Sequence, residues 1–292
     1  MQRSLALNKG QADTYAAVVT QGRISSQVPE LISDAAGGRV HSCFRSSLNL
    51  EICGHLIHIG TDRPGLCCFG LSVSEYEMAQ ILDGLQTDDR VVCRPDCIRI
   101  YGSRRIVTLN REQFTIVDLR IPVREGGSIP GAGLLYRELE ARVGTWLREG
   151  RLGLEPDASF VYYSKLLSDR IDPEKAVAYF LGRGKGLTPG GDDILTGYGA
   201  ILQMTGTAGP LVHAVCSRLT GTTDVSRAYL ESMEKGYANE VFVQLLNQLF
   251  RENLLDIRKL LCKMEEMGHT SGCDTLYGVY LALKKFKEDT IV

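Results

Sequence analysis

Residues 182–193 read GRGKGLTPGGDD, and five of these twelve residues are glycine. The apolar run ILTGYGAIL follows directly. Glycine lets the backbone adopt positive φ and turn its N–H groups to one side. The start of a helix adds unpaired N–H groups and the positive end of the helix dipole. A glycine-rich loop that leads into a helix therefore predicts a binding site for a phosphate or carboxylate.

A second stretch, residues 268–274, repeats this spacing with the sequence GHTSGCD. Both stretches fit the pattern G-x-T-[PS]-G-x-D. The alignment pairs Gly186 with Gly268, Thr188 with Thr270, Gly190 with Gly272, and Asp192 with Asp274. Helix capping alone requires one suitable residue and not three matched positions. We therefore predict that the two helix starts face each other across a cleft and share one small anionic ligand.

The residue types suggest roles in such a site. Histidine is the side chain most often used as a general acid or base, so His269 is a candidate for that role, while Asp192 and Asp274 are candidate proton acceptors. The residues expected to bind the anion supply a positive charge, a hydroxyl or a backbone N–H: Arg183, Lys185, Gly186, Thr188, Gly190, Gly191, Thr222, Thr223, Thr270, Ser271 and Gly272. No cofactor is required by the pattern, although Asp192 and Asp193 could together hold a cation such as Mg²⁺.

A structural interpretation stays open for each of these residues. Glycine can end one helix and Asp192 can cap the next. Asp193 can complement the helix dipole from the first turn. His269 can be a structural histidine, and residues 220–226 can be a capping run. The order of a Walker loop is absent because Lys185 precedes the last turn, and no serine-hydrolase, zincin or Rossmann motif occurs.

The first half of the chain has the pattern of strands and hairpins. Residues 40–50, 56–59, 67–73 and 90–123 alternate polar and apolar side chains between turn signals. Ser74, followed by Glu77, predicts a capping box and a short helix over residues 75–85. His55 and His58 are three apart in a strand, so they point to opposite faces and are poor metal partners for each other.

From residue 134 onward the apolar period becomes helical. Helices are predicted near residues 159–168, 173–181, 192–205, 210–219, 226–234, 239–250, 254–267 and 273–287. The fold class is therefore α+β, with a β-rich barrel or sandwich-like domain over residues 1–130. A mostly α-helical domain carrying the glycine-rich loops follows over residues 131–292.

Composition narrows the class of protein. The 292 residues carry a net charge of −2, so no basic surplus exists for extended nucleic-acid binding. No signal peptide and no membrane-spanning run are recognisable, so we expect a cytoplasmic protein. Nine cysteines, an odd number with scattered spacing, are typical of reduced thiols in that compartment.

Three stretches together resemble the AllH family: residues 186–193 (GLTPGGDD), residues 221–226 and residues 268–274. Gly190 stands where the family usually has serine. The resemblance implies a subunit of oxamate carbamoyltransferase, which works with AllF (FdrA-like) and AllG subunits in allantoin and purine breakdown. That enzyme converts oxalurate and phosphate to oxamate and carbamoyl phosphate, which are mostly small anions. Two alternatives remain: a non-catalytic scaffold or metabolite-binding subunit, and a stand-alone Mg²⁺-dependent hydrolase or lyase of a small carboxylate.

Overall fold

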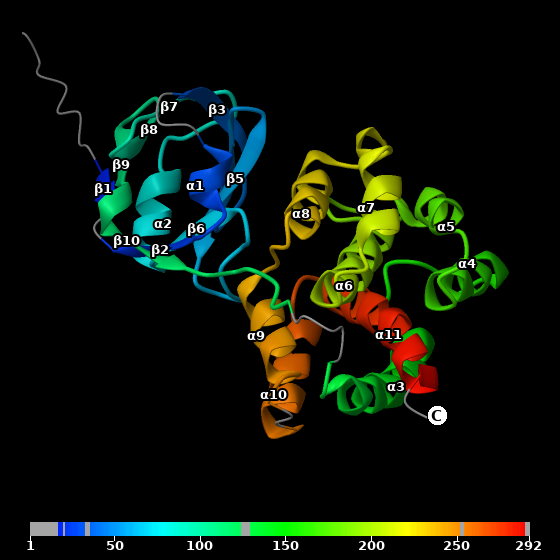
Figure 1. The fold of residues 1–292 in the computed structure, drawn as a ribbon. Coiled ribbons are helices and arrows are strands. Elements are labelled where there is room, and N and C mark those ends of the chain that lie inside the picture. Colours follow the sequence, from blue (N-terminus) through cyan, green and yellow to red (C-terminus); the bar gives the residue numbers. More distant parts are fainter. Residues whose placement is uncertain (1–16, 20, 33–35, 124–128, 252–253, 290–292) are drawn as a thin grey trace, which may run out of the picture.

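The computed structural model describes residues 17–19, 21–32, 36–123, 129–251 and 254–289. Within them a β-rich part is followed by a helical part, as the sequence predicts (Figure 1). The predicted join at residues 124–133 lies partly outside the described residues. Strands end at Val117 and the long helices begin at Ala132.

The strands form one sheet that curls into a nearly closed barrel. They are β1 (Ala17–Val19), β2 (Gly22–Ser25), β3 (Ala36–Cys43), β4 (Leu48–Ile52), β5 (His55–Thr61), β6 (Gly70–Val73), β7 (Arg90–Cys93), β8 (Cys97–Tyr101), β9 (Ile106–Asn110) and β10 (Phe114–Val117). Their order is β1-β9-β8-β7-β3-β4-β5-β6-β2-β10. The nine strands from β2 to β10 make the barrel. Most pairs are antiparallel, whereas β5 with β6, β2 with β10 and β1 with β9 are parallel.

Alternation along the strands builds the barrel core. In β8, Ile98 and Ile100 are buried, while Arg99 and Tyr101, which alternate with them, are exposed. Two short helices, α1 (Val28–Leu31) and α2 (Glu75–Leu82), lie on the barrel. The predicted capping box at the start of α2 is confirmed, because Ser74 and Glu77 exchange side-chain and backbone hydrogen bonds.

The helical part contains α3 to α11. Their bounds are α3 (Ala132–Glu149), α4 (Ala158–Ser168), α5 (Pro173–Phe180), α6 (Gly190–Met204), α7 (Gly209–Cys216), α8 (Asp224–Glu234), α9 (Glu240–Gln248), α10 (Leu254–Glu265) and α11 (Ser271–Asp289). These helices match the predicted ones to within a few residues at each end. The helix α6 is buried along most of its length and lies against α11 at the centre of this part.

Glycines let α6 and α11 approach until their backbones touch. A Cβ atom on Gly197 would lie 1.9 Å from the carbonyl oxygen of Thr275, and one on Gly278 would lie 2.0 Å from that of Ile194. The two contacts are reciprocal, since each helix offers a glycine to the other helix's carbonyl. Any side chain at either glycine would force the helices apart.

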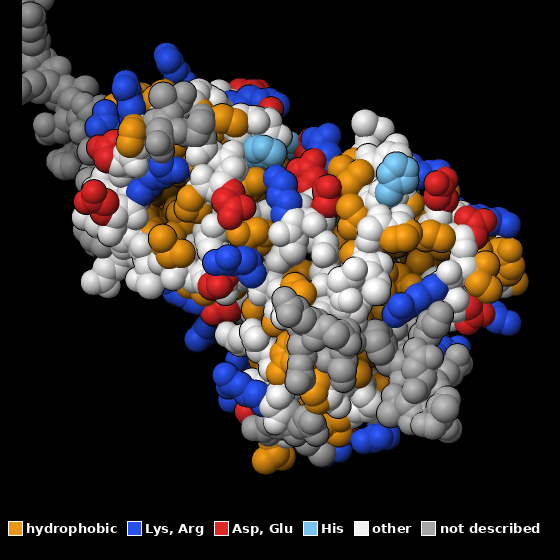
Figure 2. All heavy atoms as spheres, in the orientation of Figure 1, with side chains coloured by type: hydrophobic (Ala, Val, Ile, Leu, Met, Phe, Trp, Pro, Cys, Tyr) orange, Lys and Arg blue, Asp and Glu red, His pale blue; other side chains and the backbone are white. Residues whose placement is uncertain are grey.

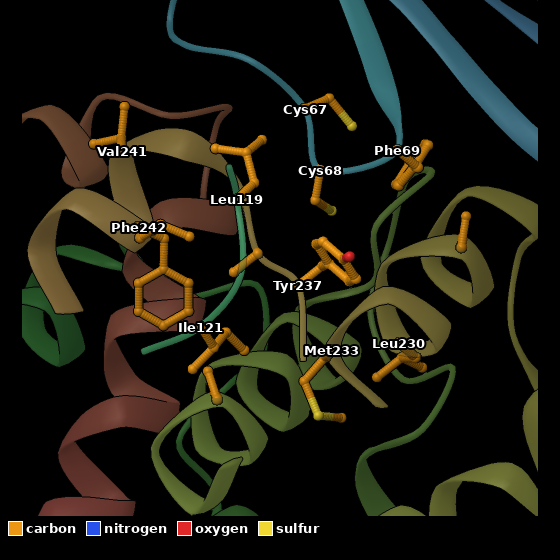
Figure 3. Packing of buried hydrophobic residues seen from close by; sticks show 14 of the residues in the cluster. Cys67, Cys68, Phe69, Leu119, Ile121, Leu230, Met233, Tyr237, Val241 and Phe242 are labelled. Carbon is orange, nitrogen blue, oxygen red and sulfur yellow. The ribbon is translucent and has the colours of Figure 1, made fainter. Parts of the chain in front are cut away.

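The barrel and the helices are joined by hydrogen-bonded backbone. The segment that follows β10 lies beside the segment between α8 and α9. Ile121 N–H donates to the Gly236 carbonyl, and Ala238 N–H donates to the Leu119 carbonyl. At the start of α9, Glu240 and Leu66 exchange two further hydrogen bonds of 3.0 Å. Figure 3 shows Leu119, Ile121, Tyr237 and Phe242 packed together beneath Cys68, so an apolar core continues across the join.

The surface in Figure 2 has basic and acidic side chains interspersed, without a large area of one sign on that face. This agrees with the near-balanced charge of the sequence. In the part of the chain that the structure describes, no helix is both long enough and apolar enough to cross a membrane.

Candidate functional site

The structure brings the three polar turns of the sequence together. Thr188 Oγ1 lies 2.8 Å from Ser271 Oγ, which joins the loop before α6 to the first residue of α11. The Thr223 hydroxyl donates to the carbonyl of Leu187 and also accepts from Ser226 N–H, so it caps α8. The starts of α6, α8 and α11 therefore meet at one place.

The two duplicated turns match in their loops but are shifted by one residue in their helices. Gly186 and Gly268 both have positive φ, as the sequence alignment pairs them. The helices, however, begin at Gly190 and Ser271, and the reciprocal glycines are Gly197 and Gly278. The first loop thus contains one more residue than the second. The alignment is wrong by one position within the helices, and the structural counterpart of Asp274 is Asp193.

The backbone N–H groups at these helix starts are mostly used within the fold. Gly191 N–H donates to the Arg183 carbonyl, and both Asp192 and Asp193 N–H groups donate to the Pro189 carbonyl. On α11, Gly272 N–H donates to the Met267 carbonyl and Asp274 N–H to that of Thr270. The turns converge as predicted, but these five amides are not free to face an anion.

Asp192 and Asp274 hold the loops in place. Asp192 Oδ1 accepts from Gly182 N–H at 2.7 Å, and its Oδ2 accepts from the Thr222 hydroxyl. Both oxygens of Asp274 accept from Gly153 N–H, at 2.9 and 3.1 Å. Burial raises the pKa of Asp192, and it raises the pKa of Asp274 to about 6. Each carboxyl group fixes a loop in a buried setting.

Asp193 differs from both, because part of its carboxyl group has no partner. The residue is 8% exposed, and its Oδ2 atom is buried without a hydrogen-bond partner among the described residues. Burial raises its pKa well above the usual range, and the Ser271 and Thr188 hydroxyls partly oppose that shift. An unsatisfied buried polar atom costs roughly 1–3 kcal/mol. Such an atom is expected where a ligand completes its hydrogen bonds.

Asp193 lines a cavity of about 250 Å³ between the helices and the barrel. Its polar wall comes from Thr188, Asp193, Thr196, Asn239, Ser271 and Thr275. Its apolar wall comes from Pro64, Ala238, Phe242, Met264 and Met267. None of the described lining residues is lysine, arginine or histidine. The cavity therefore offers hydrogen bonds and one buried carboxyl group, without a cation.

Several predicted site residues lie outside this cavity. Arg183 is exposed, and its guanidinium carbon lies 4.2 Å from the centre of the Tyr179 ring. Lys185, Gly186 and His269 are exposed. The other predicted residues that do not line the cavity serve the loops around it: Gly190, Gly191, Asp192, Thr222, Thr223, Thr270 and Asp274. Of the predicted binding residues, Thr188, Ser271 and Gly272 line it.

The aspartates do not fit a resident Mg²⁺ ion. Both Asp192 oxygens already accept hydrogen bonds, which leaves Asp193 as a single carboxylate facing the cavity. Across the described residues, no three His, Cys, Asp or Glu side chains gather as a metal site requires. Mg²⁺ is usually held by carboxylates and by substrate oxygens in octahedral geometry. A single carboxylate could hold such an ion only together with substrate oxygens and water, so these aspartates by themselves do not form a resident Mg²⁺ site.

A second cavity, of about 240 Å³, adjoins the first. The two share Pro64, Tyr229, Asn239 and Met267. The second cavity is lined by His58 and Arg63 from the barrel side. In the sequence, His58 is considered only as a metal ligand and is a poor partner for His55. Arg63 is not singled out. The available signal is a lone histidine between Ile57 and Ile59 in an apolar strand.

The fold and site define a protein in which a β-barrel and a helical unit enclose a small polar cavity at paired helix starts. Two family models match this chain. One, described as oxamate carbamoyltransferase subunit AllH, matches residues 180–283, and the other, the AllH family N-terminal domain, matches residues 17–113. Together they cover most of the chain, which belongs to the AllH family. The family description is that of an enzyme subunit, which implies protein partners. No solved structure matches this chain.

Proposed function

We propose that this chain is the substrate-binding subunit of an oxamate carbamoyltransferase complex, and that the Asp193 cavity holds the amide end of the substrate. The reaction converts oxalurate and phosphate to oxamate and carbamoyl phosphate. It balances when a phosphate oxygen bonds to the carbamoyl carbon, the C–N bond breaks, and the phosphate hydrogen goes to the departing nitrogen. The substrate oxalurate and the products oxamate and carbamoyl phosphate each carry an amide group.

The observation that carries the proposal is the unpaired Oδ2 atom of Asp193. Burial raises the pKa of this carboxyl group and favours its protonated form. A protonated carboxyl group both donates and accepts a hydrogen bond. It can therefore pair with a carboxamide through two hydrogen bonds, one to the C=O and one from the N–H.

The size and lining of the cavity support the same ligand class. Drug-sized ligands occupy clefts of roughly 300–1,000 Å³, so a cavity of about 250 Å³ suits a smaller molecule. The Thr188 and Ser271 hydroxyls add donors and acceptors beside Asp193. Since none of the described residues that line this cavity is a cation, we place the negatively charged end of the substrate elsewhere. This modifies the expectation of an anion bound directly by the paired helix starts.

The remaining parts of the expected function follow from this role. AllF- and AllG-type subunits would be the partners, and purine or allantoin breakdown would be the pathway. The chemistry would rely on positioning the carbamoyl group and on hydrogen bonds that strengthen as negative charge develops. A scaffold role, with no substrate bound by this chain, is the outcome that would displace the proposal.

The test compares two substitutions at one position, using calorimetric titration of the full chain with oxamate. Asp193→Leu removes both hydrogen bonds, and we expect it to weaken oxamate binding at least about tenfold, equivalent to about 1.4 kcal/mol. Asp193→Asn keeps one donor and one acceptor, and we expect binding within about threefold of the unmodified chain, because roughly 0.7 kcal/mol or less is lost. Oxalate, which lacks the amide group, is the control ligand and should bind less well than oxamate.

Turnover of oxalurate and phosphate by the complex with its partner subunits completes the test. Asp193→Leu should abolish it without changing the unfolding midpoint of the chain. If the Asp193→Leu complex turned over at the normal rate, substrate would not bind in this cavity and the scaffold role would replace the proposal.

A further inference from the structure

The second cavity has the chemistry of a separate binding site. It lies where the loop after β5 faces α8 and the start of α9. Tyr229 and Asn239 stand between the two cavities, since they line both. Asn239 is held in place because its Oδ1 accepts from Cys68 N–H at 3.0 Å. Two ligands, one in each cavity, would therefore lie next to each other.

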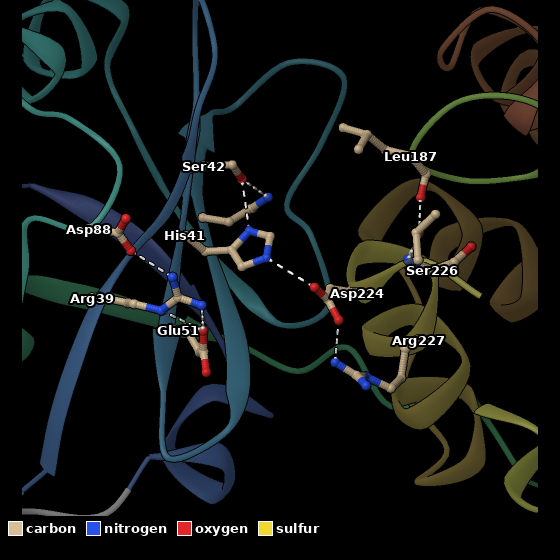
Figure 4. Close-up of polar contacts among 11 residues, drawn as sticks. Arg39, His41, Ser42, Glu51, Asp88, Leu187, Asp224, Ser226 and Arg227 are labelled. Atoms are coloured by element: carbon tan, nitrogen blue, oxygen red, sulfur yellow. Dashed lines mark hydrogen bonds and ion pairs between the residues drawn. The ribbon is translucent and has the colours of Figure 1, made fainter. Parts of the chain in front are cut away.

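A chain of hydrogen bonds fixes which nitrogen of His58 carries the hydrogen. His58 Nδ1 lies 2.9 Å from Asn49 Oδ1, which can only accept. Asn49 Nδ2 donates to Ser42 Oγ at 3.1 Å, and Ser42 Oγ lies 3.2 Å from His41 Nδ1. His41 Nε2 in turn lies 3.2 Å from Asp224 Oδ2, which accepts from it (Figure 4).

Asn49 Oδ1 has no hydrogen to give, so the donor in its contact with His58 is Nδ1. The His58 Nδ1 hydrogen is therefore committed to Asn49. Burial lowers the pKa of His58 to about 4, so the ring is neutral at neutral pH. The remaining nitrogen, Nε2, then carries a lone pair and no hydrogen.

The Nε2 atom faces the space that a side chain on Gly60 would fill, next to the second cavity. A Cβ atom on Gly60 would sit 2.7 Å from it, and both Gly60 and His58 line the cavity. A residue larger than glycine at position 60 would push the imidazole aside. The glycine thus leaves the hydrogen-bond acceptor of His58 in place beside the cavity.

Arg63 supplies a positive charge to the same cavity. Its side chain is exposed, on the loop between β5 and β6. The neighbouring carboxylates, Asp62 and Glu240, both pair with Arg23. Ser46, Ser47 and Thr61 add hydroxyl groups to the wall. The cavity therefore combines a cation and donors with one acceptor that has no hydrogen of its own.

We propose that this cavity binds an oxyanion that carries its own hydrogen, namely phosphate, with Arg63 binding its charge and His58 Nε2 accepting its hydroxyl hydrogen. Phosphate bears at least one hydrogen at neutral pH, whereas sulfate bears none. Sulfate would place an oxygen lone pair against the lone pair of Nε2 and would be rejected. His58 is thus a residue that determines specificity. The inference rests on the proposed function in naming the second reactant, which would lie beside the carbamoyl group.

The test is calorimetric titration of the full chain with inorganic phosphate and with sulfate at neutral pH. We expect phosphate to bind at least about tenfold more tightly than sulfate, equivalent to about 1.4 kcal/mol. His58→Leu removes the acceptor and its lone pair, so it should weaken phosphate binding, relieve the repulsion of sulfate and abolish this preference. Arg63→Gln, at an exposed position where folding is not at risk, should weaken both anions. Arg45→Gln removes an exposed charge that does not line the cavity and should change neither.

The inference would be overturned by equal affinities for phosphate and sulfate in the unmodified chain, or by a preference that survives His58→Leu. The absence of phosphate binding at millimolar concentration would also overturn it. Asp193→Leu separates the two proposals, because it should weaken oxamate binding and leave phosphate binding intact. Oxamate binding that is insensitive to Asp193→Leu would defeat the proposed function while leaving the phosphate site standing.

Discussion

The starts of α6 and α11 have similar backbone packing, but their equivalent carboxyl groups differ in hydrogen bonding. Each helix begins after a glycine-rich turn, packs an early glycine against the preceding helix, and offers a glycine notch to its neighbour. At equivalent positions, Asp274 is satisfied by Gly153 N–H, whereas Asp193 keeps one oxygen without a partner beside a cavity. The repeated design supplies a rigid frame, and the departure from the repeat leaves the carboxyl group that we propose as the binding group.

The largest effect is expected at the contact between the two helices. Gly278→Ala places a Cβ atom 2.0 Å from the Ile194 carbonyl oxygen, so the helices must separate. Overpacking of this kind typically costs about 1–3 kcal/mol and occasionally more, and we expect a loss of about 3 kcal/mol or more. Urea denaturation measures it.

Gly133→Ala is the matched control for that substitution. Gly133 is an exposed position in α3, and a Cβ atom there would meet no other atom within 4 Å, so alanine should raise stability by about 0.5–1 kcal/mol. Equal behaviour of the two alanine variants would show that α6 and α11 are not held by backbone contact.

The two equivalent carboxyl groups should respond differently to alanine. Asp274→Ala leaves the half-buried Gly153 N–H without its acceptor, which we expect to cost about 1–3 kcal/mol of unfolding free energy. Asp193→Ala removes an atom that already lacks a partner, so its loss should be smaller. Chemical denaturation of both variants under one condition makes the comparison. Equal losses would contradict the division between a supporting and a binding carboxyl group.

The pH dependence of stability should also distinguish the supporting carboxyl group. Burial raises the pKa of Asp274 to about 6, so between its usual value of 3.8 and that value the folded chain binds more protons than the unfolded chain. Stability from this group therefore falls as pH rises through that window. Relative to the unmodified chain, Asp274→Asn should gain about 1.4 kcal/mol between pH 5 and pH 7.

The pKa of the buried His58 is also shifted, so the effect of Asp274 must be measured as a difference in stability between variants. The lowered pKa of His58 makes stability rise with pH between about 4 and its usual 6.5, which opposes the aspartate effect. His58→Leu should therefore lose stability relative to the unmodified chain over the same interval. Parallel pH curves for the unmodified chain and Asp274→Asn would contradict the assignment.

The smallest effect is expected at the two loop cations. Arg183 lies on the Tyr179 ring and Lys185 is exposed, and neither lines the Asp193 cavity. Arg183→Gln and Lys185→Gln should each change oxamate affinity less than about twofold, which is within about 0.4 kcal/mol. Titration of each variant tests this. A large loss in either would favour an anion bound at the paired helix starts, as the sequence pattern predicts.

Local signals in the sequence were sufficient for most of the helices. Ser74 with Glu77 marked the start of α2, and the sequence patterns placed most helix ends within a few residues. Barrel and sandwich could not be distinguished, because closure depends on long-range parallel pairs such as β2 with β10 and β5 with β6. Hydrophobic alternation is the same in both architectures.

Sequence spacing predicted that the repeated turns meet, but not how their aspartates are used. The repeated turns were located correctly, and Thr188 with Ser271 does lie where they meet. Sequence spacing paired Asp192 with Asp274, because it could not reveal the extra residue in the first loop. Nor could it show that Gly182 and Thr222 occupy Asp192. His58 contacts Asn49 and lines a cavity together with a loop that follows its strand. The alternation of residues along a strand predicts which face a side chain occupies, but it predicts neither of these contacts.

The glycine notches between α6 and α11 bear on how little the cavity can adjust. Because Gly197 and Gly278 meet carbonyl groups directly, the spacing beneath Asp193 is set by main chain, with no side-chain rotation that could loosen it. The hydroxyl and carboxyl groups of the cavity would already be at fixed distances from one another before a ligand binds. Less ordering would accompany its capture, so a molecule of only a few atoms could be retained with useful affinity.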